Sequence, residues 1–235
     1  MISRLAAGLC IVAASCATPQ YGTLLQDPVR TERDRGMDAT RHPVELLQFA
    51  QVRPGMKVLD LVAGAGYTAQ VLALAVGPTG KVWAQAQNPG PALKERLAAH
   101  PQANLVVAQR PLEDPVPPEA APLDLVTLVL NYHDISYLPV DRDAMNRKVF
   151  EALKPGGRYV IVDHSALPGT GISAGKTLHR IDEAFLIAEV KRAGFVLDAE
   201  GDFMRNPEDK RDGSSNATKP VSDRFVLRFV KPVRR

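Results

Sequence analysis

The chain has 235 residues and a formal net charge of +3. This length suits one α/β domain or a small pair of domains. Basic and acidic residues are interspersed and almost balanced, which excludes the basic footprint of a nucleic-acid-binding domain. Both cysteines, Cys10 and Cys16, lie near the N-terminus, so the rest of the chain cannot form a disulfide, a cysteine-ligated metal site or a thiol nucleophile.

The first residues are typical of a bacterial export signal. Arg4 precedes an apolar stretch at residues 5–14, and small residues surround Cys16. This stretch is too short to cross a bilayer, which needs roughly 20 residues. Two processing sites stay open: acylation of Cys16, as in lipoproteins, and ordinary cleavage after Ala17. We therefore expect residues 1–17 to direct export, and the protein to be periplasmic or anchored to the membrane through acylated Cys16.

Residues 18–41 are polar and predict an irregular N-terminal extension. Three arginines cluster there, at Arg30, Arg33 and Arg35. They form either a solvated surface or a group that closes over acidic residues of a pocket on binding.

Residues 42–235 alternate between helical and strand patterns, and they form the predicted main domain. Helices are expected at residues 42–51, 68–76, 91–100, 141–153 and 179–192. Strands are expected at residues 57–62, 81–85, 104–108, 123–130, 158–163, 195–199 and 225–230. Asp141 is the expected N-cap of its helix. Residues 206–223 are polar and contain glycine and serine, which favours a mobile excursion.

Strands that alternate with helices predict a doubly wound, mostly parallel α/β sheet. The apolar run at residues 123–130 is typical of a strand buried on both faces. The last strand differs, because Phe225, Leu227 and Phe229 alternate with residues that include Arg228. This alternation predicts a half-exposed antiparallel strand at the C-terminal end of a seven-stranded sheet.

The most informative stretch is Val58 to Tyr67, where an apolar strand stops at Gly64-Ala65-Gly66 and a helical pattern follows. A Gly-x-Gly turn after a buried strand lets a ligand approach bare backbone. Residues 53–61 resemble the entry to motif I of S-adenosylmethionine (SAM) methyltransferases. Residues 153–158, Leu-Lys-Pro-Gly-Gly-Arg, resemble the same superfamily's approach to its fifth strand.

Four later segments are similar to a bacterial family of exported, predicted class I SAM-dependent methyltransferases: Asn131-Tyr132-His133-Asp134, residues 163–165, residues 177–182 and residues 223–227. The resemblance covers nearly all of the chain after the leader. It implies the class I methyltransferase fold, SAM as cofactor, and methyl transfer to an unidentified acceptor, a small molecule among the options. It places cofactor-binding residues at Asp60, Gly64, Gly66, Tyr67, Gln87 and Asn131. Tyr67 could equally be a core residue.

Two departures from the superfamily pattern concern the cofactor. Val62 stands where a glycine is usual, which narrows the backbone freedom of the loop. Ala86 stands where an acid normally binds both ribose hydroxyls. A charge-assisted hydrogen bond of this kind contributes about 1.5–3 kcal/mol. Gln87 could replace it only in part.

His133, His164 and His179 fall at predicted strand ends or just beyond, with Asp134 and Asp163 beside them. Open α/β sheets bind ligands at this edge. Three interpretations compete: polar residues that satisfy loop backbone, substrate-contacting or general-base residues, and a metal site. We favour the second and expect no metal ligands, because no close-spaced ligand pair lies on one helix face.

His133 is the preferred general base, because its unperturbed pKa lies near the working pH, and Asp134 could orient it or substitute for it. The residues expected to contact substrate are Tyr132, Asp163, His164, His179 and Arg180.

Two rival functions remain. The first is an inactive, methyltransferase-like protein of the cell envelope that binds a small ligand, which Val62 and Ala86 favour and the intact Gly64-Ala65-Gly66 loop opposes. The second is metal-assisted hydrolysis at the histidine cluster. Export also weighs against the enzyme, because SAM is made in the cytoplasm.

Overall fold

The computed structural model describes residues 21–219 and 221–233. The predicted export signal and the acylation site at Cys16 lie outside these residues. The helices are α1 (Tyr21–Leu24), α2 (Glu32–Arg41), α3 (Pro43–Phe49), α4 (Tyr67–Val76), α5 (Pro91–Ala99), α6 (Tyr132–Ile135), α7 (Arg142–Ala152), α8 (Gly175–Leu178) and α9 (Glu183–Arg192). The strands are β1 (Lys57–Leu61), β2 (Lys81–Gln85), β3 (Leu105–Ala108), β4 (Leu123–Val129), β5 (Leu153–His164), β6 (Val196–Gly201) and β7 (Arg224–Val230).

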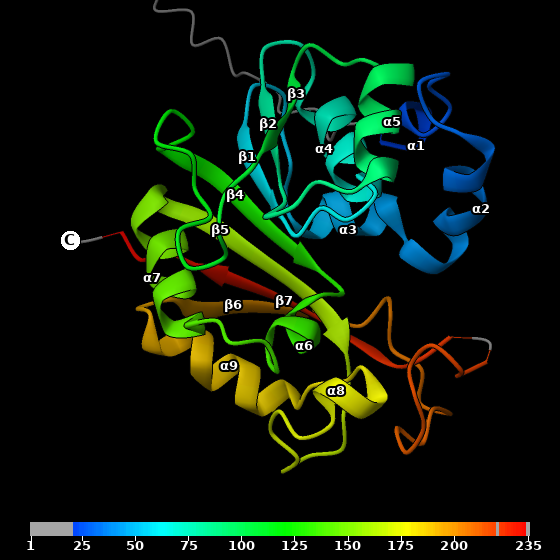
Figure 1. Cartoon of the computed structure of the whole chain (residues 1–235), viewed down its shortest axis with the longest axis vertical. Coiled ribbons are helices and arrows are strands. Elements are labelled where there is room, and N and C mark those ends of the chain that lie inside the picture. Colours follow the sequence, from blue (N-terminus) through cyan, green and yellow to red (C-terminus); the bar gives the residue numbers. More distant parts are fainter. Residues whose placement is uncertain (1–20, 220, 234–235) are drawn as a thin grey trace, which may run out of the picture.

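The strands form one seven-stranded sheet in the order β3-β2-β1-β4-β5-β7-β6 (Figure 1). The strands from β3 to β5 pair in parallel, whereas β7 runs antiparallel to both of its neighbours, β5 and β6. This confirms the predicted doubly wound fold. The expected half-exposure of β7 is wrong, because β7 lies inside the sheet and Val226 is buried too. The strand at the edge, β6, has the more exposed pattern instead.

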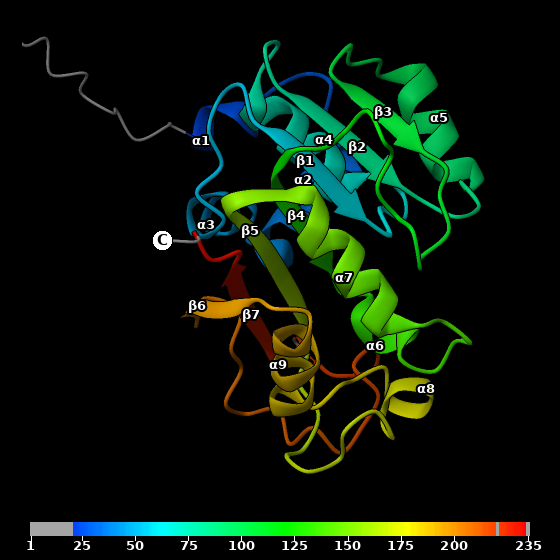
Figure 2. The same cartoon turned by 90° about the vertical axis from the view of Figure 1, so that its left-hand side faces the viewer.

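Helices cover both faces of the sheet, and each face has its own core. In Figure 2, α7 and α9 lie in front of the sheet and α3 lies behind it. Met145 and Leu186 belong to the core under α7 and α9, whereas Leu47 and Leu72 belong to the core under α3 and α4. Among the described residues, no helix combines the length and apolar character that a membrane crossing requires.

The N-terminal extension is helical rather than irregular. The Thr31 side chain accepts a hydrogen bond from the Asp34 backbone N–H, and the Asp34 carboxylate accepts one from the Thr31 backbone N–H. This reciprocal capping box starts α2, and a left-handed residue, His42 (φ 46°), ends it. The predicted domain boundary after residue 41 therefore coincides with a sharp turn between two helices.

The helix expected over residues 179–192 starts later. His179 takes a left-handed conformation (φ 52°) that ends the short helix α8, and Asp182 caps α9 by accepting a hydrogen bond from the Ala184 backbone N–H. The short helix α6, which carries His133, was not predicted either. Both differences bring His179 back toward α6, because α6 and α8 pack against each other.

The excursion at residues 206–223 is tied to the body of the domain. Asp209 forms an ion pair with the fully buried Arg180 at 2.8 Å, and it also accepts a hydrogen bond from the Asp223 backbone N–H at 2.6 Å. The prediction of a mobile excursion overlooked these contacts, which join residues far apart in the sequence.

Candidate active site

A cavity of about 550 Å³ opens where β1 and β4 end, and this volume falls within the range of small-molecule sites. Five groups of residues line it: the end of β1 and its loop, the start of α4, helix α2, helix α5 and the end of β4. Of the predicted cofactor residues, four belong to this lining: Asp60, Gly64, Tyr67 and Asn131. The fold thus brings together, around one cavity, residues that lie far apart in the sequence.

The loop after β1 has the sharp backbone that its glycines predict. Gly64 has a φ of 56°, and Val62, which stands where glycine is usual, also takes a left-handed conformation (φ 50°). Such a conformation in a β-branched residue costs about 1–3 kcal/mol and persists only when neighbours enforce it. Here the Gln85 side chain accepts from the Val62 N–H at 2.9 Å, and the Asn131 side chain donates to its carbonyl at 3.3 Å.

Asp60 is a buried carboxylate with an unused oxygen. Its Oδ1 accepts a hydrogen bond from the Thr127 hydroxyl at 2.7 Å, whereas its Oδ2 has no hydrogen-bond partner among the described residues. Burial raises the pKa of Asp60 to about 7. An unpaired buried carboxylate oxygen costs free energy, and a cationic ligand group at the cavity would remove that cost.

Two predicted cofactor residues do not line the cavity. Gly66 caps α4, and a Cβ added to it would lie 2.8 Å from Leu93 Cδ1, so this glycine admits helix α5 rather than a ligand. Gln87 is exposed beyond β2 and lies outside the lining. Gln85 is the glutamine that shapes the site, since it joins the Val62 loop to the Arg110 carbonyl.

Helix α2 is fastened across the cavity by buried charges. The Tyr67 hydroxyl donates to Asp38 Oδ1 at 2.6 Å, and Arg30 pairs with the same carboxylate at 2.6 Å. Arg96 of α5 pairs with Asp34 of α2 at 2.7 Å. Tyr67 therefore lines the cavity and also holds helix α2 against it through the hydrogen bond to Asp38. Of the two interpretations of the arginine cluster, a solvated surface does not hold for Arg30, whose side chain is fully buried.

Arg33 of α2 lines the cavity, in agreement with the alternative that the arginine cluster lies over the pocket. The sequence did not predict three further lining residues: Met37 and Arg41 come from α2, and Glu95 comes from α5. Arg41 lies 5.9 Å from the centre of the Tyr67 ring, and burial lowers its pKa. The Thr31 capping box was a local signal for α2, but nothing in the sequence distinguishes Glu95 from an ordinary exposed helix residue.

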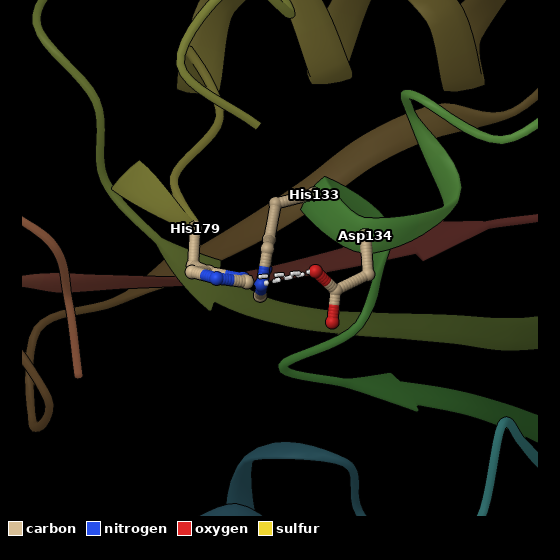
Figure 3. A group of neighbouring side chains, drawn as sticks. All are labelled: His133, Asp134 and His179. Atoms are coloured by element: carbon tan, nitrogen blue, oxygen red, sulfur yellow. Dashed lines mark hydrogen bonds and ion pairs between the residues drawn. The ribbon is translucent and has the colours of Figure 1, made fainter. Parts of the chain in front are cut away.

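A second group of polar residues lies at the same sheet edge, after β4 and β5. Asp163 Oδ1 lies 2.6 Å from His133 Nδ1. Asp134 Oδ1 lies 3.2 Å from His133 Nε2 and 3.1 Å from His179 Nδ1, and Figure 3 shows these three side chains together. Burial lowers the pKa of His133, but the hydrogen bond to Asp163 and the charges of Asp163 and Asp134 outweigh burial, so its pKa is raised. The structure therefore confirms that these side chains converge.

The neighbouring His164 is buried and behaves differently. Its Nδ1 lies 2.6 Å from the Ser222 hydroxyl, and burial together with the charge of Arg224 lowers its pKa to about 2. Asp163 is fully buried, and its carboxylate also accepts hydrogen bonds from the backbone N–H groups of His133 and His164. His164 and Asp163 therefore support the site from within rather than contact a substrate directly.

Tyr132 and Arg180 were predicted to contact substrate, and the structure corrects both predictions. Both side chains are completely buried. The Tyr132 hydroxyl donates to Glu189 at 2.9 Å in the core beneath α9. The Arg180 guanidinium donates to Asp209 and to the Ser165 carbonyl. The position of these two residues near strand ends suggested substrate contact, but their side chains belong to buried hydrogen-bond networks that support the fold.

Known proteins resemble this chain most clearly in its first half. A family model described as protein-L-isoaspartate(D-aspartate) O-methyltransferase (PCMT) matches residues 28–105. A ubiquinone/menaquinone biosynthesis C-methyltransferase, UbiE, from Cupriavidus metallidurans is 30% identical over 118 residues, which cover 49% of this chain and 46% of the relative. The chain thus matches about half the length of such curated relatives.

Solved structures match nearly the whole chain. A SAM-dependent methyltransferase from Aquifex aeolicus has a TM-score of 0.61 at 17% identity, covering 89% of this chain and 97% of the other. An S-adenosylmethionine-dependent methyltransferase from Mesorhizobium loti has a TM-score of 0.59 at 15% identity, covering 80% and 96%. In fold the chain is similar to SAM-dependent methyltransferases, and over about half of its length its sequence is similar to a curated methyltransferase. The comparisons give no support to an inactive ligand-binding protein.

The cavity fits SAM, the cofactor of this class of proteins. The lining holds one carboxylate with an unpartnered oxygen, Asp60, and a guanidinium, Arg41, and these two charges are complementary to the ammonium and carboxylate of the methionine end. Glu95 is the second carboxylate of the lining. It is a candidate to bind the ribose hydroxyls, because Ala86 has replaced the acid that usually does so. Gly64 also lines the cavity, and because it has no side chain it leaves the backbone of the loop accessible to a ligand.

Proposed function

We propose that the protein transfers the methyl group of SAM to a small-molecule acceptor with an oxygen or nitrogen nucleophile. One observation carries the proposal: Asp60 belongs to the lining of a cavity of suitable size beside the Gly64 loop, and the Oδ2 of its buried carboxylate lacks a hydrogen-bond partner among the described residues. A cationic ligand group is the partner that this oxygen lacks.

Different residues of this chain bind different parts of the cofactor. Asp60 binds the ammonium, Arg41 the carboxylate and Glu95 the ribose hydroxyls. Tyr67 fixes α2 over the cavity through Asp38. SAM, when bound, supplies a methyl carbon activated by its sulfonium. The protein's main contribution to rate is to hold donor and nucleophile together.

Asn131 lines the cavity and lies two positions before His133 in the chain, so the cavity and the histidine cluster are joined by a short segment. We place the acceptor between them. His133 and Asp134 would accept the O–H or N–H proton of the acceptor. The acceptor's lone pair would bond to the methyl carbon as the bond from that carbon to sulfur breaks, with S-adenosylhomocysteine as the leaving group. Asp163 holds the His133 ring in place from behind. His133 remains the proton acceptor predicted from the sequence.

Isothermal titration calorimetry of the purified protein with SAM and with S-adenosylhomocysteine tests the proposal. We expect micromolar binding of at least one of them. Adenosine is the matched control: it lacks the methionine end that Asp60 and Arg41 bind, so it should bind far more weakly. Equal binding of adenosine, or no binding of all three ligands, would contradict the proposal.

The proposed location is the cell envelope, which follows from the leader-like sequence before residue 18. Cell fractionation of the protein and of its Cys16→Ser variant tests this. A lipoprotein should leave the membrane fraction when Cys16 is replaced. A protein cleaved after Ala17 should be periplasmic in both forms, and a cytoplasmic protein would overturn the proposal.

A further inference from the structure

His133, Asp134 and His179 form a compact group made from two segments. His133 and Asp134 belong to α6, and His179 ends α8 (Figure 3). One ligand atom from each of the three residues can be chosen so that all lie within 4.8 Å of one another. The three side chains point toward a common centre. Our expectation of no metal ligands rested on spacing along one helix, and it did not address a site assembled from two helices.

The contacts of His133 leave one of its ring nitrogens directed at the group. Asp163 is fully buried, accepts two backbone N–H groups and lies 2.6 Å from His133 Nδ1, so it engages that nitrogen. The other ring nitrogen, Nε2, lies 3.2 Å from Asp134 Oδ1. An imidazole nitrogen and a carboxylate oxygen are both ligands that a transition-metal ion accepts.

The distances suit a metal ion. A tetrahedral ion with bonds of about 2.0–2.1 Å holds its ligand atoms about 3.3 Å apart. Asp134 Oδ1 lies 3.2 Å from His133 Nε2 and 3.1 Å from His179 Nδ1. A small adjustment of the side chains would admit the ion.

The surroundings also match those of metal sites. Ligating histidines usually donate their other N–H to a carboxylate, and ligating carboxylates are themselves hydrogen-bonded. Asp163 holds His133 in this way, and the Tyr137 hydroxyl donates to Asp134 Oδ1 at 3.0 Å. The side chains of His179 and Asp134 are 34% and 39% exposed, so an ion and a further ligand can reach the site from solvent.

We propose that His133, Asp134 and His179 bind a divalent transition-metal ion, zinc being the expected one, with an open coordination position. Two histidines and one carboxylate with a free position are typical of catalytic zinc sites. The open position would take an oxygen of the acceptor, an assignment that rests on the proposed methyl transfer, whereas metal binding itself does not. With the ion bound, His133 and Asp134 would be ligands, and the metal-bound acceptor oxygen would release its proton to solvent; the base role proposed above for His133 applies only to the metal-free site.

Calorimetry of the EDTA-treated, dialysed protein with zinc chloride tests the site. We expect one zinc ion per chain with micromolar or tighter affinity. His179→Ala and Asp134→Asn should each weaken binding at least tenfold, whereas His42→Ala, at the C-terminal end of α2, should leave it unchanged. The visible absorption spectrum of the cobalt form should show tetrahedral coordination and should be lost in His179→Ala.

Thermal melts and SAM titrations of the same samples separate the possible failures. If SAM binds but zinc does not, or if zinc binds His179→Ala as tightly as the parent protein, the metal site is wrong and methyl transfer stands. If zinc binds as expected but SAM does not, the site stands and the proposed acceptor role falls. His179→Ala should melt like the metal-free parent protein, which shows that lost binding is not lost folding.

Discussion

The cavity and the histidine cluster lie at the same edge of the sheet, yet they are built differently. The cavity is formed by main-chain turns such as Gly64 and by a buried carboxylate, Asp60, with an oxygen that nothing in the described structure satisfies. Around the histidines, Asp163 and Arg180 are fully engaged by neighbours. A buried carboxylate oxygen without a partner, on a residue that lines a cavity, is a candidate ligand contact, whereas a saturated network indicates internal support.

The family model divides the molecule along the same line. Its match, residues 28–105, contains most of the cavity lining but none of the histidine cluster. A shared cofactor requires a shared binding geometry, whereas acceptors vary between enzymes of one fold. The cavity therefore lies mostly within the part of the chain that this model matches, whereas the histidine cluster lies outside that part.

The largest expected effect tests whether Arg180 is structural. Arg180→Met should lower the free energy of unfolding by about 3–5 kcal/mol, because it leaves the buried carboxylate of Asp209 without its counter-ion. SAM affinity of the folded protein should not change. Urea unfolding and calorimetry measure the two quantities.

Arg192→Ala is the matched control for this experiment. The Arg192 side chain is 52% exposed, so its ion pairs should contribute no more than about 1 kcal/mol. If Arg180→Met lost SAM affinity without losing stability, Arg180 would be a ligand-contacting residue and its structural role would be wrong.

The next effect separates the two glycines of the loop. Gly66→Ala should cost about 2–4 kcal/mol of stability, because the new Cβ meets Leu93 at 2.8 Å and the backbone is left-handed (φ 83°). Gly64→Ala has open space around its Cβ and should cost about 1 kcal/mol. Because Gly64 lines the cavity, its substitution should instead weaken SAM binding more than that of Gly66. Thermal melts with and without SAM report both, and the reverse order would restore Gly66 as a cofactor residue.

Asp60→Asn removes the charge that should bind the cofactor's ammonium. We expect SAM to bind about 10- to 150-fold more weakly, since hydrogen bonds to charged groups contribute about 1.5–3 kcal/mol. Calorimetry measures the loss. Unchanged affinity would show that Asp60 does not face the cofactor.

Stability against pH provides a second measurement on the same variant. The folded pKa of Asp60, about 7, lies above the reference value of 3.8, so the native state holds a proton that the unfolded chain releases. This contribution to stability is full below about pH 4 and is lost as pH rises to about 7. An asparagine side chain does not titrate, so the melting temperature of Asp60→Asn relative to the parent protein should rise from about pH 4 to pH 7 and then level off. A flat difference would contradict the raised pKa.

The smallest expected effect concerns the ribose. Glu95→Gln should weaken SAM binding about fivefold, or about 1 kcal/mol, because an exposed carboxylate contributes less than a buried one. Gln87→Ala should have no measurable effect, since Gln87 lies outside the cavity lining. Calorimetry of the two variants side by side decides which residue substitutes for the missing acid at Ala86, and the opposite result would support the prediction from the sequence.

Much of the fold was predictable because the signals are local. Strand β2 matches its predicted bounds, and Asp141 caps α7 by accepting from the Ala144 N–H at 2.8 Å, as expected. The site was predicted less well. Residues before and after a strand end are adjacent in the sequence, but whether a side chain there is open or buried depends on distant segments. Tyr132 meets Glu189 and Arg180 meets Asp209, and no spacing rule reveals either contact.

By itself, the sequence determined the order of strands and helices, the glycine turn after β1 and the gathering of histidines at one sheet edge, because periodicity and turn chemistry act over a few residues. Only the tertiary structure decided that α2 covers the cavity, that Asp60 keeps an oxygen without a partner among the described residues, and that His179 reaches α6. Those outcomes depend on packing between segments far apart in the chain, where burial and charge pairing are settled together.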